Sequence, residues 1–179
     1  MRYPGETHSA RLAAETALLL TLASVLGYAE SALLPPLPVP GLRLGLANLA
    51  VVLAFLRLGR PRALLVSLGR VVVVGVATGT LFGPVGALSS GGALASWAVM
   101  ALLTRAEGRF TAIGWSVAGS AAHVVAQLFI ASALVGSAAV VSLAPFSLAL
   151  SLPTGLAIGL SARTVISRVS RPVLSTAGV

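Results

Sequence analysis

The sequence predicts an all-α integral membrane protein with six transmembrane helices. Hydrophobic residues make up 57% of its 179 residues, charged residues make up 9%, and the mean hydropathy is +1.01. A soluble domain carries about 25% charged residues, and a fold of this size leaves many residues in contact with water. So large an apolar fraction excludes a water-soluble fold and a disordered chain. One span takes about 20 apolar residues, so the chain has room for about six.

Six apolar runs, separated by short polar or proline- and glycine-containing segments, are the candidate spans. They cover about residues 12–34, 42–58, 63–82, 85–103, 110–135 and 140–160. This pattern divides the chain into three parts: a cytoplasmic N-terminus 1–11, a six-helix transmembrane domain 12–160 and a basic cytoplasmic tail 161–179.

The first run is longer than the apolar region of a signal peptide and has a poor cleavage site at Ala29-Glu30-Ser31, so we expect a retained helix. It ends before segment 35–41, where four prolines cannot continue a helix. The second run follows this stiff connection and ends in a basic cluster, Arg57, Arg60 and Arg62.

The third run carries Arg70 and ends at the Gly83-Pro84 turn. The fourth run contains the small polar stretch 89–92 and is followed by a polar loop. The fifth run is long and continuous, and the sixth carries Pro145 and Pro153. We find no convincing internal repeat, which argues against a transporter built from inverted repeats.

The charge distribution predicts the topology. All 12 basic residues are arginine, all four acidic residues are glutamate, and the net charge is +8. The N-terminus, the second-to-third loop, the fourth-to-fifth loop and the tail hold every arginine except Arg43 and Arg70. The positive-inside rule then places both termini in the cytoplasm of a multi-pass protein of the inner (plasma) membrane. Because the arginines separate apolar runs rather than line one polar face, we expect a lipid bilayer and no nucleic acid as partner.

An ionisable side chain within the hydrocarbon costs at least about 2.5–3.5 kcal/mol and is a functional candidate. Arg70 is the clearest case, and two interpretations are open: a side chain that snorkels to the interface, or one that faces a pocket. Glu30 and Arg43 flank the proline-rich segment on the same predicted side. They form either a structural ion pair or contacts to a ligand.

Three further polar residues lie in apolar runs. Asn48 is the only asparagine and Gln127 the only glutamine, and His123 lies four residues before Gln127 on one helix face. Interhelical hydrogen bonds are the more common role for such residues, and substrate contact is the alternative. The candidate substrate-binding residues are therefore Glu30, Arg43, Asn48, Arg70, His123 and Gln127.

Recognisable catalytic motifs are missing from the sequence. There is no CxxC, HExxH or GxxxxGK[ST] motif, and no pair of carboxylates is placed for acid–base work. The chain has neither cysteine nor aspartate, so an aspartate-rich magnesium–diphosphate motif is impossible. We expect no cofactor and no metal site, and catalysis by this chain alone is disfavoured.

Four segments carry a resemblance to a known family. They are Leu64 to Arg70, Ser89-Ser90-Gly91-Gly92, His123 with Gln127, and, most specific, Pro38-Val39-Pro40-Gly41-Leu42-Arg43-Leu44-Gly45-Leu46-Ala47-Asn48. Over about residues 12–160 the chain resembles the Gx transporter family, also labelled heptaprenyl diphosphate synthase component I.

That family is in turn similar to the substrate-binding S-components of energy-coupling factor transporters. The resemblance implies a six-helix S-component-like bundle that binds a small molecule near its outer side and passes it to coupling and ATPase subunits. It also implies a contact to the coupling subunit at Ala13 and Ala17, which fit the Ala-x-x-x-Ala pattern of the first helix. The second label implies a different role, a non-catalytic membrane component in heptaprenyl diphosphate or quinone side-chain synthesis. Ligand identity does not follow from either.

Overall fold

The chain is helical wherever its structure is described. The structure is a computed structural model that describes residues 4–33, 45–105 and 110–169. These ranges hold six α-helices and one 3-10 helix and no β-strand: α1 Pro4–Leu33, α2 Leu46–Leu58, α3 Arg60–Ala77, α4 Pro84–Leu103, α5 Ala112–Val135, η1 Ala138–Leu143 and α6 Ala144–Val169. The prediction of an all-α protein is confirmed for these ranges.

The two terminal helices are longer than their apolar runs. Helix α1 begins at Pro4 rather than near residue 12, and α6 continues to Val169 rather than ending near residue 160. Proline is tolerated in the first turn of a helix, and the alanines that follow favour its continuation. In α6 the extra turns pack, because Ala162 is fully buried in the core. The boundaries of the apolar runs therefore do not predict where α1 begins or where α6 ends.

Four parts of the described chain are long and apolar enough to cross a membrane: His8–Leu33, Pro84–Leu103, Ala112–Val135 and Ala138–Arg168. Helix α2 has 13 residues and is about 20 Å long, against a hydrocarbon thickness of about 30 Å. Helix α3 has 18 residues and contains three arginines. The membrane character of the chain is thus supported by four helices, two fewer than the sequence predicts.

Helix α2 is short because a glycine lies at each end. Gly45 has a φ of 67° and Gly59 a φ of 80°, a conformation in which a residue with a side chain is strained. Between them, the six consecutive residues from Ala50 to Phe55 are buried. Six consecutive positions cover every face of a helix, so α2 is enclosed by the rest of the protein.

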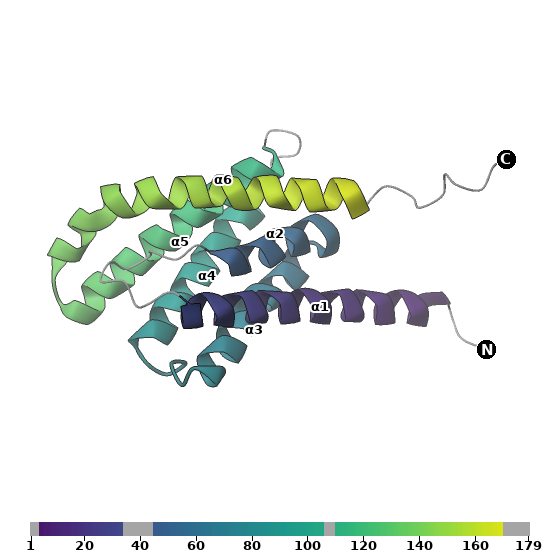
Figure 1. Cartoon of the computed structure of the whole chain (residues 1–179), viewed down its shortest axis with the longest axis horizontal. Helices are drawn as coiled ribbons and strands as arrows, with labels where there is room; N and C mark the ends of the chain where they lie inside the picture. The colour runs from purple at the N-terminus through teal and green to yellow at the C-terminus, as the bar shows by residue number, and fades with distance from the viewer. Residues whose placement is uncertain (1–3, 34–44, 106–109, 170–179) are drawn as a thin grey trace.

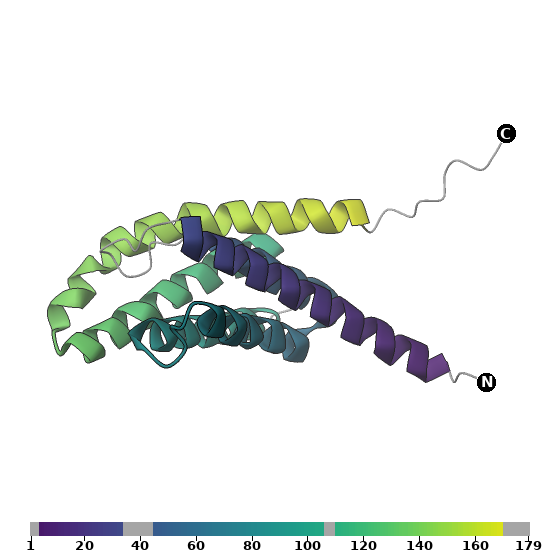
Figure 2. The same ribbon diagram turned by 60° about the horizontal axis from the view of Figure 1, so that its bottom comes forward.

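Helices α1, α3, α5 and α6 contact α2 (Figure 1). Helix α1 packs against α2 and α3, α4 packs between α3 and α5, and α6 packs against α5 and α2. The view in Figure 2 shows α1 crossing the bundle obliquely, with its N-terminal end projecting beyond it. Close packing of α6 on α5 depends on Gly155 and Gly159. A Cβ on Gly159 would lie 2.7 Å from the Cα of Ile113, so this small-residue pair serves packing within the chain.

The described arginines outside the middle of α3 lie at one end of the bundle, the end from which both terminal helices project (Figures 1 and 2): Arg11, Arg57, Arg60, Arg62, Arg105, Arg163 and Arg168. Two contacts fix the half-buried Arg60 there. Its Nε donates to Thr104 Oγ1 at 2.9 Å, and its carbonyl accepts from Trp97 Nε1 at 3.0 Å. Among the described residues, the opposite end carries one charged side chain, Glu30. We call the first the basic end.

Candidate functional site

Glu30 joins the last turn of α1 to the start of α2. Its side chain is 6% exposed, its Oε1 accepts from the Gly45 N–H at 2.8 Å, and its Oε2 accepts from the Leu46 N–H at 3.2 Å. The first N–H groups of a helix have no partner within the helix, and they carry the positive end of its dipole. The carboxylate therefore satisfies two donors and complements that charge. Arg43, with which an ion pair is one expectation from the sequence, lies outside the described residues, so that ion pair stays a prediction.

Asn48 and Arg70 extend this arrangement to a third helix. Arg70 Nη2 donates to Asn48 Oδ1 at 3.3 Å, and the Asn48 N–H donates to the Gly45 carbonyl at 2.8 Å. Arg70 is half-buried and reaches the first turn of α2, away from the basic end at which α3 begins. Three of the predicted residues, Glu30, Asn48 and Arg70, thus come together around the N-terminus of α2. We call them the α2-terminus group.

His123 and Gln127 form a second group, one helical turn apart on α5. The His123 ring lies against Gly92 of α4, where a Cβ would be 2.7 Å from Nε2. Gly92, the second of two glycines in the small polar stretch 89–92, therefore makes room for the imidazole. Gln127 is 5% exposed, and its Oε1 has no hydrogen-bond partner among the residues that the structure describes.

Ser67 ties α3 to α4 and was not predicted from the sequence. It is 2% exposed and lies one turn before Arg70 on α3, and its hydroxyl donates to the Ala93 carbonyl of α4 at 3.4 Å. Ala93 directly follows Gly92, the residue against which His123 packs. The signal was its spacing, three residues before Arg70 and hence on the same helix face.

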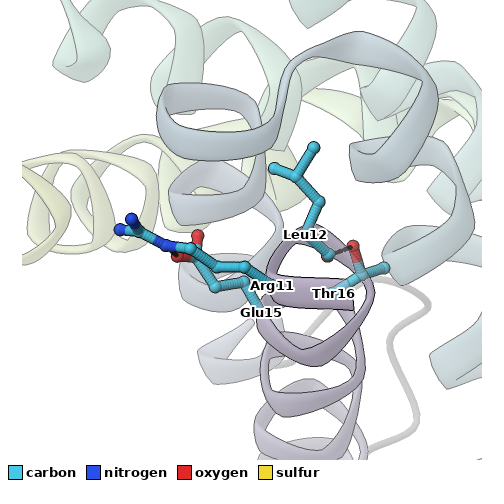
Figure 3. A network of polar contacts seen from close by, with 4 residues as sticks. All are labelled: Arg11, Leu12, Glu15 and Thr16. Atoms are coloured by element: carbon cyan, nitrogen blue, oxygen red, sulfur yellow. Dashed lines mark hydrogen bonds and ion pairs between the residues drawn. The ribbon is translucent and has the colours of Figure 1, made fainter. Parts of the chain in front are cut away.

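Ala13 and Ala17 lie in a different place, toward the basic end. Both are exposed, and both line an open groove of about 380 Å³ between α1 and α3, whose other lining residues are Ser9, Thr16, Leu20, Arg62 and Leu65. Figure 3 shows Arg11 and Glu15 pointing away from Thr16 on α1, joined by an ion pair of 3.0 Å. This pair accounts for an acidic residue between the two alanines.

The described ranges contain no group of three or more His, Cys, Asp or Glu residues that could hold a metal ion. What the α2-terminus group and the α5 pair offer is hydrogen bonding inside an otherwise apolar bundle: one carboxylate, one guanidinium, two amides and one imidazole. Such a set suits recognition of a polar small molecule.

The sequence pattern of one family, described as Heptaprenyl diphosphate synthase component I, matches residues 19–165. The chain belongs to the heptaprenyl diphosphate synthase component I family. The match includes the α2-terminus group, His123 and Gln127, whereas Ala13 and Ala17 precede it. Neither a curated protein nor a solved structure matches the chain. The further similarity to energy-coupling factor S-components therefore stays a prediction.

Proposed function

We propose that this member of the heptaprenyl diphosphate synthase component I family binds a small polar molecule within the membrane and handles it in transport, as an S-component does. The observation that carries the proposal is the buried Gln127 amide, whose oxygen lacks a partner among the described residues. An unsatisfied buried polar group costs about 1–3 kcal/mol, and in lipid no water is present to replace the missing bond. A ligand that donates an N–H or O–H to Gln127 would recover this cost.

The remaining contacts follow from the arrangement of the two groups. In this proposal His123 supplies a ring nitrogen one turn from Gln127 on α5, and Asn48 and Arg70 supply an amide and a positive charge from α2 and α3. Glu30 is placed differently, because both of its oxygens are occupied by the backbone of α2. In this proposal Glu30 positions Asn48 by fixing α2, and Arg43 completes the set from the segment before it.

The proposed placement in the membrane uses the positions of the arginines. The basic end faces the cytoplasm, six helices cross or enter the inner membrane, and both termini are cytoplasmic. The short α2 and the arginine-bearing α3 are tolerated within the bilayer because protein surrounds α2 and a partner on α2 meets Arg70.

Transport against a gradient would require partner subunits, because the sequence has no nucleotide-binding motif. We propose coupling and ATPase subunits as these partners and the exposed Ala13 and Ala17 on α1 as their contact. Small residues allow a partner helix to approach closely. Recovery of a transport-competent protein without any partner would contradict this part of the proposal.

The test of ligand binding is Gln127→Leu. Leucine removes the unpaired amide at similar volume, so we expect thermal stability to stay equal or rise while the copurifying small molecule is lost. Native mass spectrometry of the purified chain measures retained ligand, and thermal unfolding measures stability. Thr164→Val, on the exposed face of α6, is the matched control for losing a polar group and should retain the ligand. A large loss of stability in Gln127→Leu, with the ligand retained, would assign Gln127 to structure instead.

A second candidate function comes from the family name. The chain would then be a non-catalytic membrane component in heptaprenyl diphosphate or quinone side-chain synthesis. The absence of aspartate argues against diphosphate chemistry on this chain itself. Deleting the gene and measuring the amount and chain length of the quinone separates the two functions, since an uptake protein leaves both unchanged when nutrients are abundant.

A further inference from the structure

The groove between α1 and α3 is lined by the N-terminal parts of both helices. At the closed end of the groove Leu20 packs on Gly69 of α3, where a Cβ would lie 2.9 Å from Leu20 Cδ1. From this closed end the groove runs toward Ser9 on α1 and Arg62 on α3. Its side is open, because Leu65 is 56% exposed and the neighbouring Leu18 is 67% exposed. The groove therefore opens onto the apolar outer surface of the bundle.

The length of the groove matches one leaflet of a bilayer. Ser9 and Leu20 are separated by eleven helical steps, which is about 16 Å along α1. Half of the hydrocarbon core is about 15 Å. The polar residues Ser9 and Arg62 are at the end of the groove nearer the basic end, and Ala13, Ala17 and Leu20 line the wall toward the middle of the bundle.

The charge of the groove is positive. Among the side chains that the structure describes, Arg62 is the one charged residue that lines it. Glu15, the described acidic side chain of α1 that is nearest to the groove in sequence, points away from the groove-lining Thr16 and is paired with Arg11 (Figure 3). Basic pockets between transmembrane helices at the cytoplasmic side are typical sites for acidic lipid headgroups.

We propose that the groove holds an anionic phospholipid of the cytoplasmic leaflet, with its phosphate on Arg62 and one acyl chain along Ala13 and Ala17 toward Leu20. The inference depends on the proposed orientation of the basic end and not on the ligand site around Gln127. A partner helix that docks on the two alanines would displace this lipid. We therefore expect the lipid to be bound only when the chain is not bound to a partner subunit.

The experiment is native mass spectrometry of the full chain in detergent, with traces of phosphatidylglycerol or of phosphatidylcholine with the same acyl chains. We expect phosphatidylglycerol to be retained preferentially, in a one-to-one complex. Arg62→Gln should weaken its retention about fivefold, the effect of one basic residue near a lipid surface. Arg62→Lys should keep part of it. Ala17→Leu, which fills the groove at an exposed position, should abolish it without changing the melting temperature.

Arg57→Gln is the matched control, because Arg57 is an exposed arginine at the same end that does not line the groove. An equal loss in Arg57→Gln would overturn the proposal in favour of diffuse attraction to the basic end. Equal retention of the two lipids, or full competition by inorganic phosphate, would also overturn it. None of these measurements uses the transported molecule. A negative result for lipid binding therefore does not affect the test of ligand binding at Gln127, and a negative result at Gln127 does not affect the test of lipid binding.

Discussion

Replacing Glu30 by glutamine tests whether the start of α2 depends on a buried carboxylate. The substitution keeps the shape of the side chain and one acceptor oxygen, but it removes the negative charge. It also turns the second oxygen into an NH₂ group facing a backbone N–H, either that of Gly45 or that of Leu46. A hydrogen bond to a charged group is worth about 1.5–3 kcal/mol, and a charge at a helix terminus about 0.3–1 kcal/mol. We therefore expect Glu30→Gln to lower the free energy of unfolding by about 2–3 kcal/mol.

In a chain of this length such a loss lowers the melting temperature by about 4–12 °C. Tryptophan fluorescence during heating of the purified protein in detergent measures it, with Trp97 and Trp115 as the two reporters. Glu15→Gln is the matched control on the same helix. The Glu15 side chain is 30% exposed and its pair with Arg11 is at the surface, so we expect a change below about 0.5 kcal/mol. If both variants melt within 2 °C of the parent, by the same scaling of about 2–4 °C per kcal/mol, the capping of α2 by Glu30 is refuted.

Two further predictions concern contacts between helices. Gly92→Ala should cost about 1–3 kcal/mol, because the new Cβ would lie 2.7 Å from His123 Nε2. Its melting temperature, compared in the parent and in a His123→Ala background, checks this, and an equal loss in both contradicts the steric reason. For Arg70→Gln and Asn48→Ala, a double-mutant cycle should give a coupling of about 0.5–1.5 kcal/mol, since one hydrogen bond joins the two side chains. Additive losses would mean that this bond contributes nothing to stability.

The order of the helices and the gathering of arginines at one end follow from local signals. An apolar run, and the prolines and glycines that end it, can be recognised from residues that are neighbours in the sequence, so these helices can be predicted without knowledge of the fold. The hydrogen-bond partners of Glu30, in contrast, are backbone N–H groups 15 and 16 residues further along the chain. The sequence offers Arg43 as the visible opposite charge, whereas the groups that bind Glu30 are N–H groups, which nearly every residue has.

The sequence predicted several residues of the candidate site, but it did not predict which of them contact one another. For Arg70 the sequence left two interpretations open, a side chain that snorkels to the interface or one that faces a pocket. The choice depends on how α2 packs against α3, and the two residues that meet there are 22 positions apart in the sequence. Ser67, which ties α3 to α4, is one of many serines in the apolar runs, whereas Asn48 and Gln127 are each the only residue of their type, so its role could not be predicted. The length of α2 was overestimated because hydropathy does not register the left-handed conformation of Gly45.

The enclosure of α2 has a consequence for biosynthesis. At about 20 Å this helix is too short to be stable alone in a bilayer, so its place is secured only when its neighbours have arrived. Helix α6 is among these neighbours and is made last, and its Ile158 lies 3.5 Å from the position of a Cβ on Gly45. A nascent chain that stops before α6 would leave one side of α2 uncovered. Packing of α2 is therefore completed only after α6 has been synthesised, although α3, α4 and α5 lie between the two helices in the sequence.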